Sequence, residues 1–242
     1  MRLAAAVILA NLAQPALADE PVDLELVLAV DASASVDETE FALQLGGMAS
    51  AFRDKTVQAA IAGGALKRIA VAVTVWGDAT VPQDQSSWYG ITTPQDAEAF
   101  AAMLDRFPRR VTGGTGIGAG LGHAMRMFDR NGFQGSRQVV DVSGDGKETP
   151  PRAIVLQMPD ARSMAHARGV TINGLAILTD DATLSDWYRN EVATGAGSFV
   201  MSCSNYDDFA EAIRRKLIRE IEGRPMTSML DGLHAVGATA AR

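Results

Sequence analysis

Short apolar runs alternate with longer amphipathic stretches along this chain, and this alternation is the feature that most restricts its fold. Five of the apolar runs have strand length and are rich in valine and isoleucine: 23–30, 68–76, 137–143, 170–178 and 198–203. Such runs are typical of strands that are covered on both faces, as in parallel sheets. The pattern therefore predicts an α/β fold, doubly wound, with a mainly parallel central sheet and helices on both faces.

The stretches between the runs have helical periodicity, which predicts helices at 37–60, 95–106, 116–130, 152–168, 184–194 and 206–222. The last of these has one apolar stripe, with four residues spaced four apart: Phe209, Ile213, Leu217 and Ile221. A short strand or hairpin is expected around 87–91. Because the sequence contains no internal repeat and no linker, we predict one α/β domain over 19–223 and a flexible tail over 224–242.

The first eighteen residues, MRLAAAVILANLAQPALA, have the layout of a secretory signal peptide. Arg2 supplies an early positive charge, an apolar stretch follows, and the segment closes on the A-x-A pattern of a cleavage site. The apolar part is shorter than the roughly 20 residues that a membrane-spanning helix needs. We therefore expect cleavage after Ala18 and a mature protein that is secreted or periplasmic, without a membrane span.

Charge and cysteine content narrow the possible partners. The chain has 22 Lys and Arg against 29 Asp and Glu, a formal net charge of −7 that becomes −8 when Arg2 leaves with the signal. An acidic protein repels nucleic acid and anionic lipid, so we expect neither as a partner. Cys203 is the only cysteine, so it is either a buried apolar residue, which its apolar segment SFVMSC favours, or a thiol for an intermolecular bond.

Polar residues gather in three loops that follow or face the predicted strands. DASAS (31–35) follows the first apolar run. The loop VTGGTGIGAG contains GGT at 113–115, and the loop SGDGKE covers 143–148. In doubly wound sheets, ligands bind at the carboxyl ends of the strands. The three loops are therefore expected at one edge of the sheet, with two carboxylates and three hydroxyls: Asp31, Ser33, Ser35, Thr115 and Asp145.

This set contains oxygen ligands alone, which suits a hard divalent cation. Mg²⁺ is the first expectation, with Mn²⁺ or Ca²⁺ as alternatives. Ser33 and Ser35 are two residues apart, so in an extended loop both hydroxyls point to the same side. Neutral hydroxyl ligands leave much of the charge of the ion unneutralised, and such an ion attracts an anionic ligand from elsewhere.

Each loop taken alone has a simpler explanation. Ser35 could only cap the helix that follows it, GGTG could be a turn or a phosphate-binding nest, and SGDG could be a turn. Their joint occurrence, in order and next to the right strands, favours the metal site.

Together the three loops resemble the von Willebrand factor A domain family. DASAS matches the D-x-S-x-S signature of that family, and GGT with Thr115 and the glycine-flanked Asp145 match its other two metal-binding loops. These elements make up the metal-ion-dependent adhesion site of the family. The resemblance covers about 22–222. More narrowly, the chain is similar to bacterial secreted proteins that consist of little but this domain and whose function is poorly defined.

The resemblance implies roles for the five residues. Ser33, Ser35 and Thr115 would bind the metal directly, and Asp31 and Asp145 would orient bound waters or bind the ion themselves. In the family the sixth position is usually filled by a Glu or Asp of a partner. Two departures stand out: the third loop reads SGDG where many members have TDG, and Ile117 replaces a second threonine.

The leading functional hypothesis is a secreted, non-catalytic, metal-dependent module that binds an acidic group of a protein partner. By analogy with the family, the helix at 206–222 could shift with metal binding. One alternative is a Mg²⁺-dependent hydrolase or phosphoryl-transfer enzyme, although the sequence lacks a G-x-S-x-G elbow and a P-loop. In that case Asp78 and Lys147 could line the same rim, and Ser143 has no histidine placed to activate it. Another alternative is a structural protein with a vestigial metal site.

Overall fold

A seven-stranded sheet lies at the centre of the computed structural model, which describes residues 19–149 and 155–223. Its strands are β2 (Leu24–Asp31), β3 (Ile69–Trp76), β4 (Asp84–Gln85), β5 (Tyr89–Ile91), β7 (Gln138–Gly144), β8 (Thr171–Ile177) and β9 (Val200–Cys203). They follow the order β4-β3-β2-β7-β8-β9, and β5 also pairs with β3. The strands from β3 to β9 along this order run parallel, whereas β4 and β5 run antiparallel to β3. The predicted mainly parallel α/β fold is confirmed.

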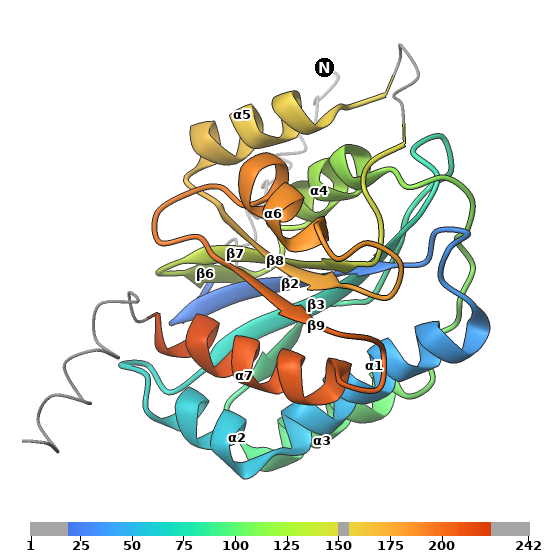
Figure 1. The fold of residues 1–242 in the computed structure, drawn as a ribbon. Coiled ribbons are helices and arrows are strands. Elements are labelled where there is room, and N and C mark those ends of the chain that lie inside the picture. Colours follow the sequence, from blue (N-terminus) through green and yellow to red (C-terminus); the bar gives the residue numbers. More distant parts are fainter. Residues whose placement is uncertain (1–18, 150–154, 224–242) are drawn as a thin grey trace, which may run out of the picture.

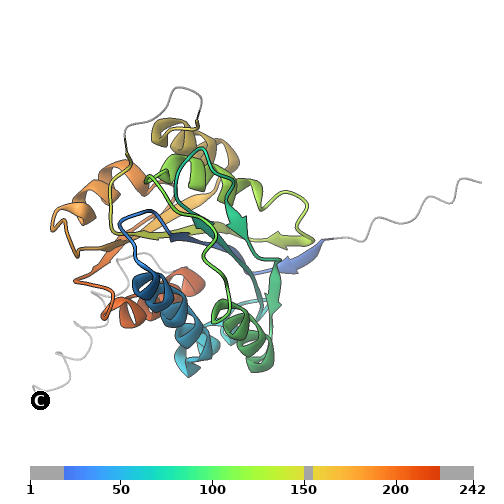
Figure 2. The same ribbon diagram turned by 90° about the vertical axis from the view of Figure 1, so that its right-hand side faces the viewer.

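Helices cover both faces of this sheet (Figures 1 and 2). On one face lie α1 (Glu38–Arg53), α2 (Lys55–Ala62), α3 (Pro94–Leu104) and α7 (Phe209–Glu222). On the other face lie α4 (Ile117–Arg126), α5 (Met158–Arg168) and α6 (Leu184–Trp187), which continues into a π-helical turn at Tyr188–Val192. None of the helices within 19–149 and 155–223 has the length and apolarity to cross a bilayer.

The central strand β2 shows why its sequence is apolar almost throughout. All eight of its residues are buried. Leu26 and Leu28 point into the core under α1, α3 and α7, whereas Val27 and Ala29 point into the core under α4 and α5. Successive side chains of a strand face opposite sides, so a strand between two helical layers needs apolar residues at both sets of positions.

The position of β2 also determines where a ligand would bind. The chain adds β3 on one side of β2 and, later, β7 on the other. The order of strands therefore reverses next to the carboxyl end of β2, which is Asp31. Crevices at such switch points are the usual ligand sites of doubly wound sheets.

Two of the predicted helices are wrong in their extent. The predicted helix 37–60 is two helices, because Asp54 has an extended backbone that ends α1 and begins α2, where its carboxylate accepts a hydrogen bond from the Thr56 N–H at 2.7 Å. The predicted helix 184–194 is α6 followed by the π-helical turn. A capping aspartate within a continuous amphipathic pattern is indistinguishable from a surface aspartate in the sequence.

The remaining elements differ less from expectation. The strand expected around 87–91 is β5, and α7 begins three residues later than predicted, at Phe209. A small parallel sheet of β1 (Glu20–Val22) and β6 (Phe133–Gly135) was not predicted, because three-residue strands carry too little periodicity. Helix α5 begins at Met158, and the start of the predicted helix 152–168 lies outside the described residues, as do the segments predicted to be a signal peptide and a tail.

Helix α7 packs on the sheet through more than its predicted stripe. The stripe residues are buried, but so are Lys216 and Glu220. The Lys216 Nζ atom lies 2.6 Å from Asp141 Oδ1 of β7 and 2.7 Å from Glu220 Oε1. Asn173 of β8 donates to the same Glu220 oxygen at 2.8 Å. The helix is thus tied to the sheet by a buried ion-pair network that the apolar pattern did not indicate.

Cys203 is buried at the end of β9. Burial raises the pKa of its thiol to about 12, which keeps the thiol protonated and unreactive at neutral pH. This environment agrees with the apolar role that its sequence context favoured.

Candidate functional site

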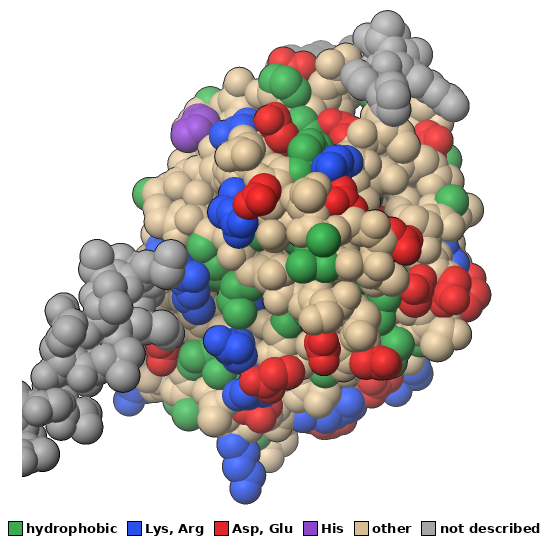
Figure 3. All heavy atoms as spheres, in the orientation of Figure 1, with side chains coloured by type: hydrophobic (Ala, Val, Ile, Leu, Met, Phe, Trp, Pro, Cys, Tyr) green, Lys and Arg blue, Asp and Glu red, His purple; other side chains and the backbone are tan. Residues whose placement is uncertain are grey.

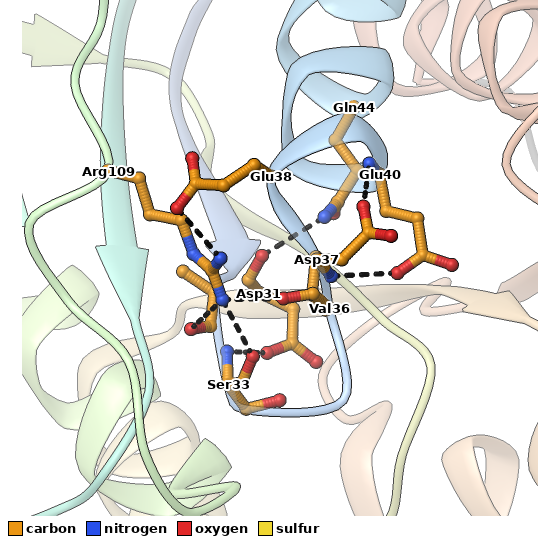
Figure 4. A network of polar contacts seen from close by, with 9 residues as sticks. Asp31, Ser33, Val36, Asp37, Glu38, Glu40, Gln44 and Arg109 are labelled. Atoms are coloured by element: carbon orange, nitrogen blue, oxygen red, sulfur yellow. Dashed lines mark hydrogen bonds and ion pairs between the residues drawn. The ribbon is translucent and has the colours of Figure 1, made fainter.

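The first predicted loop leaves β2 at Asp31 and turns sharply before α1 (Figure 4). Asp31 Oδ1 accepts a hydrogen bond from the Ser33 N–H at 2.7 Å, which closes the turn. Gln44 of α1 donates to the Asp31 carbonyl at 3.0 Å. The Arg109 guanidinium donates to the carbonyls of Ser33, at 3.1 Å, and Val36, at 2.5 Å. The loop is therefore held from three sides, with its hydroxyls left to face the other two loops.

The helix after this loop has a cap of its own. Asp37, not Ser35, is the N-cap residue of α1: its carboxylate accepts from the Glu40 N–H, and the Glu40 carboxylate accepts from the Asp37 N–H, both at 2.8 Å. The helix-cap explanation of Ser35 is therefore wrong, because the hydroxyl of Ser35 points elsewhere.

The three predicted loops meet at the carboxyl edge of the sheet. Ser35 Oγ donates to Asp145 Oδ1 at 2.7 Å and lies 3.1 Å from Ser33 Oγ. The Ala34 N–H donates to the Gly113 carbonyl at 2.7 Å, which joins the first loop to the GGT loop. A Cβ atom placed on Gly146 would lie 3.8 Å from Thr115 Oγ1, so the GGT and SGDG loops also touch. The structure thus brings Asp31, Ser33, Ser35, Thr115 and Asp145 to one small region.

Glycines make this approach possible. A Cβ on Gly144 would lie 2.7 Å from both Asp31 Oδ2 and the Tyr188 hydroxyl, a contact that no side chain tolerates. Gly113 has a φ of +102°, in the left-handed region that favours glycine. Glycine at 144 therefore lets the SGDG loop approach Asp31 more closely than any other residue would, and glycine at 113 lets the GGT loop turn.

Asp31 is in an unfavourable environment for an anion. Its side chain is fully buried, and its Oδ2 atom has no hydrogen-bond partner among the described residues. Burial, together with the nearby charge of Asp145, raises the pKa of Asp31 to about 7. The Tyr188 hydroxyl next to it also lacks a partner in the described part of the chain, and burial raises the pKa of that hydroxyl well above its usual value. A buried carboxylate oxygen without a hydrogen bond costs free energy, and a cation would offset that cost.

These residues fit a hard divalent cation. The donors are hydroxyl and carboxylate oxygens, the charges of the two carboxylates act on each other, and one carboxylate oxygen has no partner among the described residues. The described residues hold no group of three or more His, Cys, Asp or Glu side chains placed to bind a metal. A site at this edge would therefore depend on hydroxyls for most of its protein ligands.

Two residues at the site were not found by sequence reasoning. The Tyr206 hydroxyl donates to Asp145 Oδ2 at 3.0 Å, and the Gln44 side chain joins the Asp31 carbonyl to Ser143 by accepting from its hydroxyl at 3.2 Å. The Tyr206–Asp145 and Gln44–Ser143 contacts join residues 61 and 99 positions apart in the chain, and no local pattern marks them.

Replacing Tyr206 by phenylalanine tests the first of these contacts. The variant loses a buried hydrogen bond to a carboxylate, so we expect its free energy of unfolding to fall by about 1.5–3 kcal/mol in chelator. Urea unfolding measures the change. Tyr89→Phe, at a half-buried tyrosine outside the site, is the matched control, and an equal loss in both variants would contradict the expectation.

The residues considered for catalysis have other roles. Lys147 forms an ion pair with Asp181 at 2.7 Å, and Asp78 accepts from the Thr80 N–H at 2.8 Å. Ser143 donates to Gln44. The rings of His123 and His166 contact Gln85 and Thr194, and His234 lies outside the described residues. None of these contacts forms a serine–histidine pair.

Solved structures share this fold. Proximal thread matrix protein 1 from the mussel byssus superimposes with a TM-score of 0.54 at 17% identity, over 83% of this chain and 46% of that protein. The same protein with a zinc-occupied MIDAS motif gives a TM-score of 0.53 at 16% identity, over 82% of this chain and 45% of that chain. The vWF domain of the type V pili tip protein Mfa5 from Porphyromonas gingivalis gives 0.53 at 12% identity, over 83% and 95%.

These similarities establish the von Willebrand factor A-like fold. This chain spans less than half the length of the mussel protein. No curated protein matches the sequence. One family model matches residues 21–225, which include all of the loops described above. The chain therefore belongs to the family described as "Protein of unknown function (DUF1194)".

Proposed function

We propose that this protein is a secreted, non-catalytic module that binds a divalent cation at the loops of Asp31, Thr115 and Asp145, and through that cation an acidic group of a protein partner. The observation that carries the proposal is the buried Oδ2 atom of Asp31, which has no hydrogen bond from any residue within 19–149 and 155–223, in a site built from oxygen ligands. The fold, shared with a protein that holds zinc in its MIDAS motif, supports it.

In this proposal Ser33, Ser35 and Thr115 bind the ion through their hydroxyls. Asp31 and Asp145 lie behind them and supply the negative charge, either directly or through oriented water. When bound, the ion supplies a Lewis-acidic position that accepts an anionic oxygen. Gln44 and Arg109 keep the first loop in place through the Asp31, Ser33 and Val36 carbonyls.

Binding of an acidic partner follows from the number of ligands. The five proposed residues supply at most one oxygen each to an ion that prefers six, and three of these oxygens are neutral hydroxyls, so one position stays open for an oxygen from elsewhere. A carboxylate from a partner would complete the coordination by an anion that the chain itself does not supply. The signal peptide expected at 1–18 would place this site outside the cytoplasm.

Isothermal titration of the mature chain, residues 19–242, tests the metal site. Mg²⁺, Mn²⁺ and Zn²⁺ are titrated into wild type and Ser33→Ala after removal of metal with chelator. We expect Ser33→Ala to bind at least about tenfold more weakly, since loss of even an outer-shell partner weakens metal sites by that factor.

Ser50→Ala is the matched control, because Ser50 is an exposed residue of α1 far along the helix from the loop. It should bind metal like wild type. Equal binding by wild type and Ser33→Ala, or no binding of any of the three ions by wild type, would refute the proposed site.

A further inference from the structure

Exposed carboxylates gather at the edge of the sheet where the parallel strands end. Parallel strands have their carboxyl ends at one edge, so the loops after β2, β8 and β9 all lie near the candidate metal site. Seven carboxylates from these loops and from the start of α1, here called the acidic rim, lie there: Asp37, Glu38, Glu40, Asp180, Asp181, Asp207 and Asp208.

Basic residues precede the strands at the opposite edge. They stand before β3, β7 and β8 and in the last turns of α7: Lys67, Arg68, Arg137, Arg168 and Arg219. Figure 3 shows this separation on one face, with acidic side chains gathered at the right, where α1 begins in Figure 1, and basic ones toward the left, near the end of α7.

Cations at the acidic edge do not cancel the rim. Arg109 pairs with Glu38 at 3.1 Å, and its side chain is only 12% exposed because it reaches under the first loop. Lys147 pairs with Asp181 at 2.7 Å. The rim carboxylates Asp180, Asp207 and Asp208 are exposed and contribute their charge to the surface.

We infer that the partner presents its metal-binding carboxylate within a positively charged segment, flanked by lysine or arginine. This inference rests on the proposed function. The unpartnered Asp31 Oδ2 marks the place for a cation, and the rim surrounds that place with negative charge. An acidic group alone would have to approach against the rim, whereas flanking cations convert the same rim into an attractive surface.

The acidic rim therefore favours partners with a positively charged segment over partners with a negatively charged one. Opposed charges across an interface steer association and reject partners of the wrong sign. The range of this effect is about 8 Å at physiological ionic strength, so residues within two or three positions of the bound carboxylate are those that the rim can sense.

Fluorescence anisotropy with three peptides tests the inference. Each peptide carries one central glutamate and a neutral dye, and the glutamate is flanked on both sides by two lysines, two serines or two aspartates. In Mg²⁺ or Mn²⁺ at low salt, we expect the lysine peptide to bind about tenfold or more tightly than the serine peptide, and the aspartate peptide to bind most weakly. The differences should shrink at about 0.5 M NaCl. A lysine peptide with glutamine at its centre should not bind.

Two double variants of equal charge locate the effect. Asp180→Asn with Asp207→Asn removes two rim charges, and Asp129→Asn with Glu191→Gln removes two exposed charges after α4 and in the π-helical turn. The lysine peptide should lose at least about threefold in affinity with the rim variant and keep wild-type affinity with the other.

The possible failures are distinguishable. Metal-dependent binding that is equal for the three peptides would overturn this inference and leave the proposed function standing. An equal loss in both double variants would also overturn it, because only the net charge would then matter. Binding of the lysine peptide that persists in chelator, or no binding of any peptide in metal, would contradict the proposed function and the inference together.

Discussion

Replacing Lys216 by methionine is expected to lower the free energy of unfolding by about 3–5 kcal/mol, because it leaves two carboxylates buried without their cation. The Lys216 side chain is fully buried, and its Nζ atom lies within 2.7 Å of oxygens of both Asp141 and Glu220. Methionine has a similar volume and fills the space, so the loss reports on charge rather than on packing.

The loss should depend on pH. Burial and the charge of Asp141 raise the pKa of Glu220 above its usual range, whereas Lys216 lowers it. A carboxyl whose folded pKa is raised costs stability as pH rises from its unfolded pKa through its folded one. Removing Lys216 raises the folded pKa of Glu220 further, so the variant should lose most above neutral pH and least near pH 5, where Glu220 is protonated.

Urea unfolding at pH 8 and pH 5 measures both effects. Lys55→Met, at an exposed position that begins α2, is the matched control and should change stability by less than about 0.5 kcal/mol. Adding Asp141→Asn and Glu220→Gln to Lys216→Met should recover part of the loss, since no buried charge then remains. A loss below about 1 kcal/mol at pH 8 would show that the network does not hold α7 to the sheet.

Replacing Asp31 by asparagine is expected to have opposite effects on stability and on metal binding. The pKa of Asp31 is raised from 3.8 to about 7, so this group costs the ion-free protein stability as pH rises from 3.8, and the full cost is reached above about pH 7. The shift corresponds to about 4 kcal/mol at most, and asparagine should recover about 1–3 kcal/mol of it in chelator at pH 8. The gain should shrink as pH falls from 7 to 4 and vanish below about pH 3, where Asp31 is protonated in the folded and unfolded states alike.

In Mg²⁺ we expect the opposite order of stability, with wild type more stable than Asp31→Asn. Wild type gains stability from the bound ion by mass action, whereas Asp31→Asn lacks a charge that the proposed site requires. Thermal unfolding measures both arms, because about 1 kcal/mol shifts the Tm of a chain of this length by about 2–4 °C. Asp160→Asn, at an exposed position in the first turn of α5, should show neither effect. A variant that is less stable than wild type in chelator at pH 8 would mean that Asp31 is not under strain there.

The proximity of the three loops is a feature that the sequence alone could predict. Asp31 and Asp145 stand at the ends of apolar runs, and a parallel sheet brings the carboxyl ends of its strands to one edge whatever the helices do. Their proximity could therefore be expected from the strand pattern alone. The Tyr206–Asp145 and Gln44–Ser143 contacts could not, because each joins residues whose spacing in the chain bears no relation to their spacing in the fold.

Helix α7 likewise has one feature that the sequence predicted and one that it did not. The apolar stripe of α7 predicted its buried face, because a period near 3.6 residues puts Phe209, Ile213 and Leu217 on one side. The burial of Lys216 on that helix was not predicted, because a lysine in an amphipathic pattern is usually at the surface and its carboxylate partner Asp141 lies on a strand 75 positions earlier.

The sequence by itself determined the parallel α/β fold and the loops of the candidate site, because both follow from periodicity and from the local order of strands and glycines. Only the tertiary structure decided which polar side chains of this fold are buried and which partners they have. It buried Asp31 with one oxygen unpaired, gave Asp145 its hydrogen bond from Tyr206, and enclosed Lys216 between two carboxylates. Burial and charge depend on neighbours brought together from the whole chain, and no local pattern records them.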